Sequence, residues 1–511
     1  MKKYDAIVVG AGMGGLACAC VLAKNKKRVL MLEQSHTAGG FANSFIRGRF
    51  EFEVSLHELC GFGRHDMPFG PVRGLFDYLG ISDKIEWVDI PDAYRLLTFN
   101  DKNKYDFRMP FGIKEYINKL EEYVPGSKKE VTRLFDSGTN VRKEIEALSK
   151  PIGGLKKTAA LLKNGVLLHT ASYSFNDVIS TFDLPQKAKD ILSGYWAYLC
   201  TDLDTLDFVH YIQMLNSYIE LKSVIPANRS HEMVNCLVDC FKENGGDIYL
   251  NSKVTKINCN NGAVTGIELE DGTSFESQTV VCNCSPHNVY GKMMNKEDIP
   301  EFEIKKANFR DFGGRGFCVF LGLNKSAEEL NLKDYSYFIY PDMDTVKQFK
   351  RMALPETNDV QNTVCINAVY PDASPKGTCM LCMTTLFTSD YWSNVSPEKY
   401  YEEKERFALH MIDVFEKATG VKIRDCIEEM ETASPATFAR FTDTPNGVIY
   451  GYIGKKFDGV VARRMEKTGP NVKGLHFAGG YGHMLLGYSS ALSSGRSVAN
   501  KILNETEGAD K

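Results

Sequence analysis

The chain opens with apolar runs separated by a glycine-rich turn, and this pattern predicts a β–α–β unit. Residues 4–9 form a short apolar run with the character of a strand, and the glycines of residues 10–15 follow it directly. Residues 16–24 have the composition of a helix, and residues 28–33 form a second apolar run that ends in an acid. Two strands joined by a helix predict the start of a parallel sheet with helices on its faces.

Similar patterns predict elements along the rest of the chain. We expect strands at 248–254, 254–257, 263–269, 274–281, 317–323, 364–370, 378–388 and 474–480, and helices at 69–79, 113–123, 230–244, 344–352, 397–419 and 489–503. Residues 39–57 are expected to form a turn, a short helix and a return strand. The dipeptides Asn261-Gly262 and Asp271-Gly272 are typical of hairpin turns.

These elements predict an α/β fold in which two domains are interleaved. A Rossmann-type nucleotide-binding domain is expected to take up the two ends of the chain and a middle segment, residues 1–60, 225–300 and 425–511. An α+β substrate domain is expected to take up residues 61–224, which are rich in helical runs, and residues 301–424.

The glycine-rich turn carries the first chemical signal. It consists of Gly10, Ala11, Gly12, Met13, Gly14 and Gly15. Gly10 suits a tight turn, Gly12 lets the backbone approach a pyrophosphate, and Gly15 lets the helix pack closely on the strand. The N-terminus of that helix offers unpaired N–H groups to the anion. Glu33 stands where a carboxylate binds the ribose hydroxyls of an adenosine, the alternative being a solvated acid at the strand end. The spacing does not distinguish FAD from NAD.

Composition and charge limit the classes of partner. The 511 residues are 43% hydrophobic and 25% charged, which is ordinary for a globular protein. A net charge of −4 provides no basic field for nucleic acid, so we expect no nucleic-acid partner. No apolar signal region precedes the first strand, and we therefore expect a cytoplasmic location. The sequence leaves the oligomeric state open.

The 14 cysteines are expected to be reduced thiols, and no metal site is expected. Cys379 and Cys382 form a C-x-x-C pair within a strand-like run that lacks a second pair, which favours core packing. Residues 474–495 carry no Lys, Arg, Asp or Glu, but their glycines and serines favour a cofactor loop followed by a helix over a membrane span.

With these segments in order, the chain resembles the phytoene desaturase, carotenoid isomerase and retinol saturase group of FAD-dependent oxidoreductases, which shares its fold with amine oxidases. The resemblance spans nearly the full length. It rests on residues 8–15 with Glu33, 39–40 with 45–59, 245–254, 280–286, 434–440 with 450–451, and 474–487.

The resemblance implies non-covalently bound FAD. Further contacts are implied for Gln34, Gly39, Gly40, Phe41, Ala42, Val254, Gly479 and Gly480. Among these, Gly39, Gly40 and Ala42 would lie near the pyrophosphate and ribityl chain, and Val254 would contact the adenine through its backbone. Gly479 and Gly480 would approach the flavin end, where a planar ring needs backbone without side chains. Phe41 replaces a basic residue that is common in the group, and Gly480 replaces a common Asp.

Five residues are candidates for the chemistry on the substrate. His57 and Glu58 follow the return strand and could transfer protons, the alternative being a structural histidine beside a surface glutamate. His483 is a further proton-transfer candidate, with a similar alternative. Arg440 and Tyr450 flank a turn in a block that resembles a substrate-facing strand pair, and either could shape a polar end of the site. The alternative for Arg440 is an ordinary salt bridge.

The expected function is redox chemistry on carbon–carbon double bonds, by desaturation, saturation or isomerisation, of a hydrophobic isoprenoid-like or long-chain lipid. The alternatives are an amine oxidase-like flavoenzyme acting on C–N bonds and a non-catalytic protein of the same fold that binds prenyl groups or lipids. Residues 141–170 carry six basic and two acidic side chains. This stretch favours a solvated helix face, and peripheral contact with a membrane is the alternative.

Overall fold

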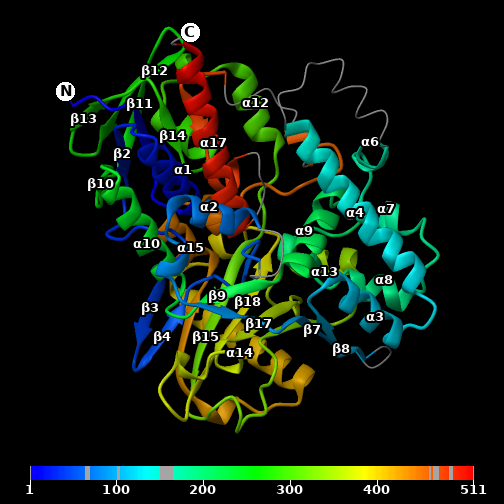
Figure 1. The fold of residues 1–511 in the computed structure, drawn as a ribbon. Coiled ribbons are helices and arrows are strands. Elements are labelled where there is room, and N and C mark those ends of the chain that lie inside the picture. The colour runs from blue at the N-terminus through cyan, green and yellow to red at the C-terminus, as the bar shows by residue number, and fades with distance from the viewer. Residues whose placement is uncertain are drawn as a thin grey trace.

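The computed structural model describes residues 2–63, 70–100, 104–149, 165–459, 462–463, 471–482 and 487–509. A parallel five-stranded sheet has the order β10-β2-β1-β14-β20. Its strands are β1 (Ala6–Val9), β2 (Val29–Leu32), β10 (Asp247–Tyr249), β14 (Val280–Cys282) and β20 (Leu475–Phe477). The sheet thus joins segments from both ends and the middle of the chain, and Figure 1 shows both termini at the same end of the molecule.

Alternate residues of these strands supply two cores. Ala6 and Val8 of β1 pack beneath the helices α1 (Met13–Lys24), α2 (Pro71–Leu79), α10 (Ser230–Glu243) and α17 (Tyr488–Ala509). Ile7 and Val9 pack on the other face, against the antiparallel sheet of β11 (Val254–Asn260), β12 (Ala263–Leu269) and β13 (Ser274–Glu276). Because successive side chains of a strand point to opposite faces, one apolar run serves both cores.

A second sheet has seven strands in the order β19-β15-β18-β17-β16-β7-β8. They are β7 (Asp92–Thr98), β8 (Asp106–Pro110), β15 (Arg315–Leu323), β16 (Ser336–Tyr340), β17 (Gln361–Cys365), β18 (Cys379–Phe387) and β19 (Ile427–Ala433). All pairs are antiparallel except β16 with β7. Short sheets join β3 (Ser44–Arg47) to β4 (Phe50–Glu53), and β5 (Leu59–Cys60) and β6 (Trp87–Asp89) to β9 (Ser223–Pro226).

Helices cover both faces of the seven-stranded sheet. One face packs against the helical segment that follows β8, made of α3 (Ile113–Tyr123), α4 (Lys128–Ser149), α6 (Val166–Thr170), α7 (Phe175–Ile179), α8 (Gln186–Leu192) and α9 (Phe208–Leu221). The other face packs against α14 (Pro397–Thr419). Figure 1 shows this helical segment gathered beside the sheet. The other α-helices in the part of the chain that the structure describes are α11 (Pro286–Asn288), α12 (Glu301–Phe309), α13 (Thr345–Arg351) and α15 (Pro435–Thr442).

The sequence-based expectation of an α/β fold with a Rossmann-type sheet is confirmed. Several local predictions were wrong. The short helix expected within residues 39–57 is instead the hairpin β3–β4, which turns at Gly48 with a φ of +53°. The strand expected at 364–370 ends at Cys365 and continues as a 3₁₀ turn, Ile366–Ala368. The strand expected at 274–281 divides into β13 and β14, which belong to different sheets.

The predicted domain division stays a prediction, and one strand crosses it. The segment of β19 was assigned to the nucleotide-binding domain, but it pairs with β15 in the seven-stranded sheet. The two cysteines of the C-x-x-C pair lie on opposite faces of β18, Cys379 in one core and Cys382 in the other. Among the described residues, no helix is both long and apolar enough to cross a membrane.

Candidate active site

A continuous cavity of about 1070 Å³ extends from the carboxyl end of β1 to the seven-stranded sheet. The predicted cofactor residues that line it are Gly10, Gly12, Gly14, Glu33, Gln34, Gly39, Gly40, Phe41, Val254, Gly479 and Gly480. Ala11, Gly15 and Ala42 are buried and are not among the lining residues. Four of the five predicted catalytic residues also line the cavity, namely His57, Glu58, Arg440 and Tyr450. His483 lies outside the described residues.

The glycine-rich turn is packed so closely that side chains would not fit. Gly10 has a φ of +94°, which favours glycine. A Cβ on Gly14 would lie 2.5 Å from the backbone N of Gly479, and one on Gly12 would lie 2.4 Å from Nδ2 of the Asn283 side chain. A Cβ on Gly15 would lie 2.2 Å from the Gly10 carbonyl oxygen, so Gly15 permits α1 to pack on the strand. The turn therefore presents bare backbone to the cavity.

Glu33 is held by the same turn. Its Oε2 accepts a hydrogen bond of 2.7 Å from the Ala11 N–H, and its Oε1 accepts one of 2.8 Å from the Ser35 N–H. Burial raises the pKa of this carboxyl, while the backbone donors act in the opposite direction. Each carboxylate oxygen has a second acceptor position, so Glu33 can also accept hydrogen bonds from hydroxyl groups in the cavity.

Asn283 is a wall residue that the sequence reasoning missed. It follows β14, and its N–H donates to the Val9 carbonyl at 2.8 Å. Its side chain adjoins Gly12, Gly14 and Gly479, so it connects the segment that follows β1 to the segment that follows β20. Its position after an apolar strand was the available signal, because carboxyl ends of parallel strands meet at one edge of a sheet.

His57 lies at the other end of the cavity, beside the seven-stranded sheet. Its Nε2 is 2.9 Å from the Thr384 hydroxyl of β18, and its carbonyl accepts a hydrogen bond from Tyr335. Burial lowers the pKa of His57 to about 4. The imidazole is therefore neutral near pH 7, which suits it to hydrogen bonding more than to donating a proton.

Glu58 is buried beside His57, and neither of its carboxylate oxygens has a hydrogen-bond partner among the described residues. Burial raises the pKa of Glu58 to about 8, with the nearby Tyr198 hydroxyl acting in the opposite direction. A carboxyl group that keeps its proton at neutral pH can donate it to a bound molecule. Glu58 is thus better placed for proton transfer than His57.

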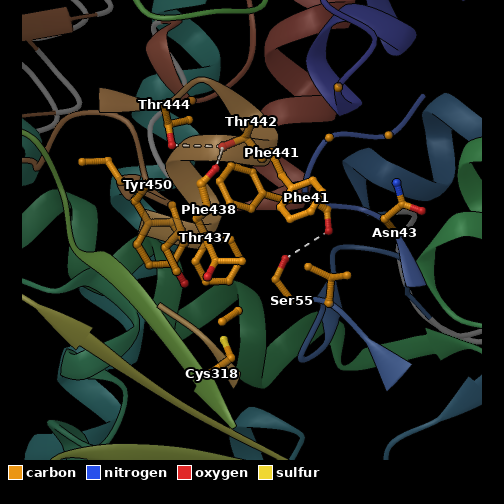
Figure 2. Close-up of a pocket in the computed structure, with 18 of the residues that line it drawn as sticks. Phe41, Asn43, Ser55, Cys318, Thr437, Phe438, Phe441, Thr442, Thr444 and Tyr450 are labelled. Atoms are coloured by element: carbon orange, nitrogen blue, oxygen red, sulfur yellow. Dashed lines mark hydrogen bonds between the residues drawn. The ribbon is translucent and has the colours of Figure 1, made fainter. Parts of the chain in front are cut away.

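The wall around Tyr450 is aromatic. Figure 2 shows Tyr450 and Phe438 facing the same space, with Phe41 beyond them. The Phe41 and Phe438 rings lie 5.7 Å apart, and the Ser55 hydroxyl donates to the Phe41 carbonyl at 3.2 Å. Burial raises the pKa of the Tyr450 phenol, which keeps it protonated.

The strand pair expected around Arg440 and Tyr450 was wrong. Arg440 is an exposed residue of the helix α15, and Tyr450 follows a 3₁₀ turn, Pro445–Gly447. Ser434 caps α15 through its hydroxyl, which accepts from the Thr437 N–H, and this cap favours the helix locally. Both predicted residues still line the cavity, from a helix and a loop.

The geometry fits a long cofactor with an anionic middle and a planar apolar end. The bare glycine turn at the N-terminus of α1 suits a pyrophosphate, and Glu33 suits a ribose. The opposite end is aromatic and contains the buried Glu58 carboxyl. FAD has these features, and the residues present fit it.

Comparisons with known proteins also indicate a flavin-binding protein. The family model for flavin containing amine oxidoreductases matches residues 13–503. The all-trans-retinol 13,14-reductase of Danio rerio is 24% identical, over 98% of this chain and 86% of that protein. A chloroplastic prolycopene isomerase of an Oncidium hybrid cultivar is 25% identical, over 98% of this chain and 84% of that protein.

Among solved structures, cyclohexylamine oxidase of Brevibacterium oxydans is 15% identical, with a TM-score of 0.63 over 99% of this chain and 100% of that chain. At this identity the likeness concerns the fold alone. The family match extends over nearly the whole chain. It agrees with the cofactor cradle formed by the turn at residues 10–15, Glu33, Asn283 and Gly479. The chain therefore belongs to the flavin containing amine oxidoreductase family and is an FAD-dependent oxidoreductase.

Proposed function

We propose that this enzyme uses FAD to desaturate, saturate or isomerise carbon–carbon double bonds of a hydrophobic, isoprenoid-like substrate. The observation that carries the proposal is Glu58, a buried carboxyl with a raised pKa and no partner among the described residues, in an aromatic part of the FAD cavity. The names of two relatives that match 98% of this chain, a retinol reductase and a prolycopene isomerase, support the substrate class. Fold alone would not support it.

FAD, when bound, supplies the acceptance or donation of a hydride. We propose that Gly10, Gly12, Gly14, Gly39 and Gly40 hold its pyrophosphate and that Glu33 holds the ribose of its adenosine. Asn283 positions the ends of β1, β14 and β20 around these glycines. Because Asn283 packs against Gly12, Gly14 and Gly479, these residues would hold FAD in a fixed position.

Glu58 carries the proton part of the reaction in this proposal. It gives a proton to a substrate carbon when a double bond is saturated, and it takes one when a double bond is formed. His57, neutral and bound to Thr384, orients the segment that carries Glu58. The aromatic walls of Phe41 and Phe438 exclude water from the reacting carbons and favour a hydrocarbon chain.

The function is tested on purified protein. We expect a flavin absorption spectrum, release of FAD on denaturation, and conversion of all-trans-retinol or a poly-cis carotenoid under anaerobic conditions with reduced enzyme. Release of hydrogen peroxide with amines and none with polyenes would favour C–N oxidation instead. Colourless protein that gains no flavin absorbance from added FAD would favour non-catalytic binding of lipids.

Two further expectations concern location. The basic stretch at 141–170 lies partly outside the described residues, and its charged residues that are described, Arg142, Lys143, Glu144 and Glu146, all belong to α4. Peripheral contact with a membrane and a cytoplasmic location stay predictions. Sedimentation with anionic vesicles and fractionation of cells would test them.

A further inference from the structure

Asn362 lies on the cavity face of the seven-stranded sheet. In the strand register, Asn362 of β17 is opposite Thr384 of β18, and Thr384 is opposite Cys318 of β15. Residues directly opposite one another share a face of a sheet. All three line the cavity, and Cys318 is visible at the lower edge of the site in Figure 2. The Asn362 carboxamide therefore faces the space assigned to substrate.

This carboxamide is buried without a complete set of hydrogen bonds. Asn362 is 7% exposed, and its Oδ1 has no partner among the described residues. A buried polar group without a partner destabilises a folded protein, so such a group at a cavity wall indicates a ligand that supplies the partner.

A second buried polar group lies nearby. The Tyr198 hydroxyl is buried near the Glu58 carboxyl and has no hydrogen bond of ordinary length among the described residues. Its ring lies 4.8 Å from that of Phe338. Phe338 is directly opposite Asn362 in the β16–β17 pair. The Tyr198 ring also lies 5.9 Å from the His57 ring, which is bound to Thr384. Asn362 and Tyr198 thus belong to one ring of neighbouring residues around the substrate space.

The chemistry of the two groups selects a ligand. Asn362 Oδ1 accepts a hydrogen bond, and a phenol donates one. An alcohol hydroxyl does both, so it has the chemistry to pair with either group. A pure hydrocarbon would leave both unpaired, which selects against it. The surrounding rings, including Phe338 and Phe320, still favour an apolar body.

We propose that Asn362, with Tyr198, binds a hydroxyl group of the substrate, so that the enzyme prefers an isoprenoid alcohol to the hydrocarbon of the same skeleton. This inference rests on the proposed function for the isoprenoid body of the substrate. It makes Asn362 a residue that determines specificity.

The test measures binding of geranylgeraniol and of the hydrocarbon in which hydrogen replaces its hydroxyl, by quenching of tryptophan fluorescence in the FAD-loaded protein. Wild type is expected to bind the alcohol at least about tenfold more tightly. Asn362→Leu, which conserves volume and removes the carboxamide, is expected to bring the two dissociation constants within about threefold. Asn362→Ala provides a second variant that introduces no bulk.

Thr363→Val is the matched control. Thr363 is the next residue of β17, fully buried, and its hydroxyl also has no partner among the described residues. It is opposite Tyr337 and Met383, which pack on the other face of the sheet. This variant is expected to keep the preference for the alcohol. Without ligand, Asn362→Leu is expected to have a Tm no lower than that of wild type. The Oδ1 atom that it removes accepts no hydrogen bond from the described residues.

The outcomes separate this inference from the proposed function. Equal binding of the two ligands by wild type, or an unchanged preference in both Asn362 variants, overturns the role of Asn362 even if polyenes are converted. A preference that is lost only in the Asn362 variants supports that role even if no conversion of either ligand is detected. In that case only the proposed reaction fails.

Discussion

Glu58 is the residue whose replacement most directly tests the proton step. Glu58→Gln keeps the shape of the side chain but removes the acid. We expect kcat to fall by about 10²- to 10⁴-fold, the usual contribution of a general acid or base. Stopped-flow measurement of the flavin absorbance with a polyene substrate checks this. Unchanged kcat would assign proton transfer to another group.

The pH dependence of the wild-type rate indicates the direction of the reaction. With the pKa of Glu58 at about 8, protonated Glu58 predominates below that pH. Addition of hydrogen to the substrate should therefore lose rate as the pH rises through about 8, and removal of hydrogen should gain rate. His57, with a pKa of about 4, should add no step near neutral pH.

The pH dependence of protein stability gives an independent measure of the raised pKa of Glu58. The folded protein holds this proton up to about pH 8, while the unfolded chain releases it near the ordinary value of 4.5. The unfolded state thus binds fewer protons between these values, so wild-type stability falls as the pH rises across them and levels off above. Glu58→Gln lacks this term. In denaturant titrations, the free energy of unfolding of the variant minus that of wild type should increase as the pH rises from about 4.5 to about 8. If this difference does not change with pH, Glu58 is not a buried acid of raised pKa.

At the scale of elements, the β1–α1 turn and β20 must approach one another through glycine. Gly14→Ala would place its Cβ 2.5 Å from the Gly479 backbone, which cannot move as a flexible side chain could. We expect a loss of about 1–3 kcal/mol in stability, and a lower FAD content after purification. Denaturant titration and the ratio of flavin to protein absorbance measure both effects.

Gly291→Ala is the matched control for that substitution. A Cβ there meets nothing within 4 Å, and the residue is exposed. Its stability should stay within about 0.5 kcal/mol of wild type, with full FAD content. Equal losses in both variants would show that the close approach at Gly14 is not responsible.

Long apolar runs allowed most elements to be predicted from the sequence. The helices Ile113–Tyr123 and Pro397–Thr419 and the strand Ala263–Leu269 have their predicted bounds. The β3–β4 hairpin was missed because the exposed Ile46 and the turn at Gly48 blur the alternation between its strands. The break after Cys365 was missed because it depends on Asn367, whose side chain bonds the Pro371 carbonyl in a local turn.

At the scale of the whole molecule, the sequence predicted the glycine-rich turn and Glu33 better than the substrate end. The glycines and Glu33 lie in one local motif, so short-range patterns suffice. Asn283, Tyr198 and Asn362 enter the site only through pairing of distant strands and packing of separate segments, which no local pattern encodes. These residues can be recognised only in the tertiary structure, as polar groups that strand register and burial place at a cavity.

The same long-range assembly predicts how FAD binding changes the molecule. The cradle joins the turn at residues 10–15, Asn283 and Gly479, which are far apart in the chain but adjacent in space. A cofactor held by all three should stabilise them together, because local opening of any one would release it. At FAD concentrations near 100 times Kd, amide hydrogen exchange in these segments should slow by up to about 100-fold relative to the apoprotein. The turn at Asn261-Gly262, between β11 and β12, does not line the cavity and provides the internal control. Protection confined to residues 10–15 would show that FAD does not bridge the ends of the chain, whereas joint protection of the three segments supports the cradle built from the beginning, middle and end of the sequence.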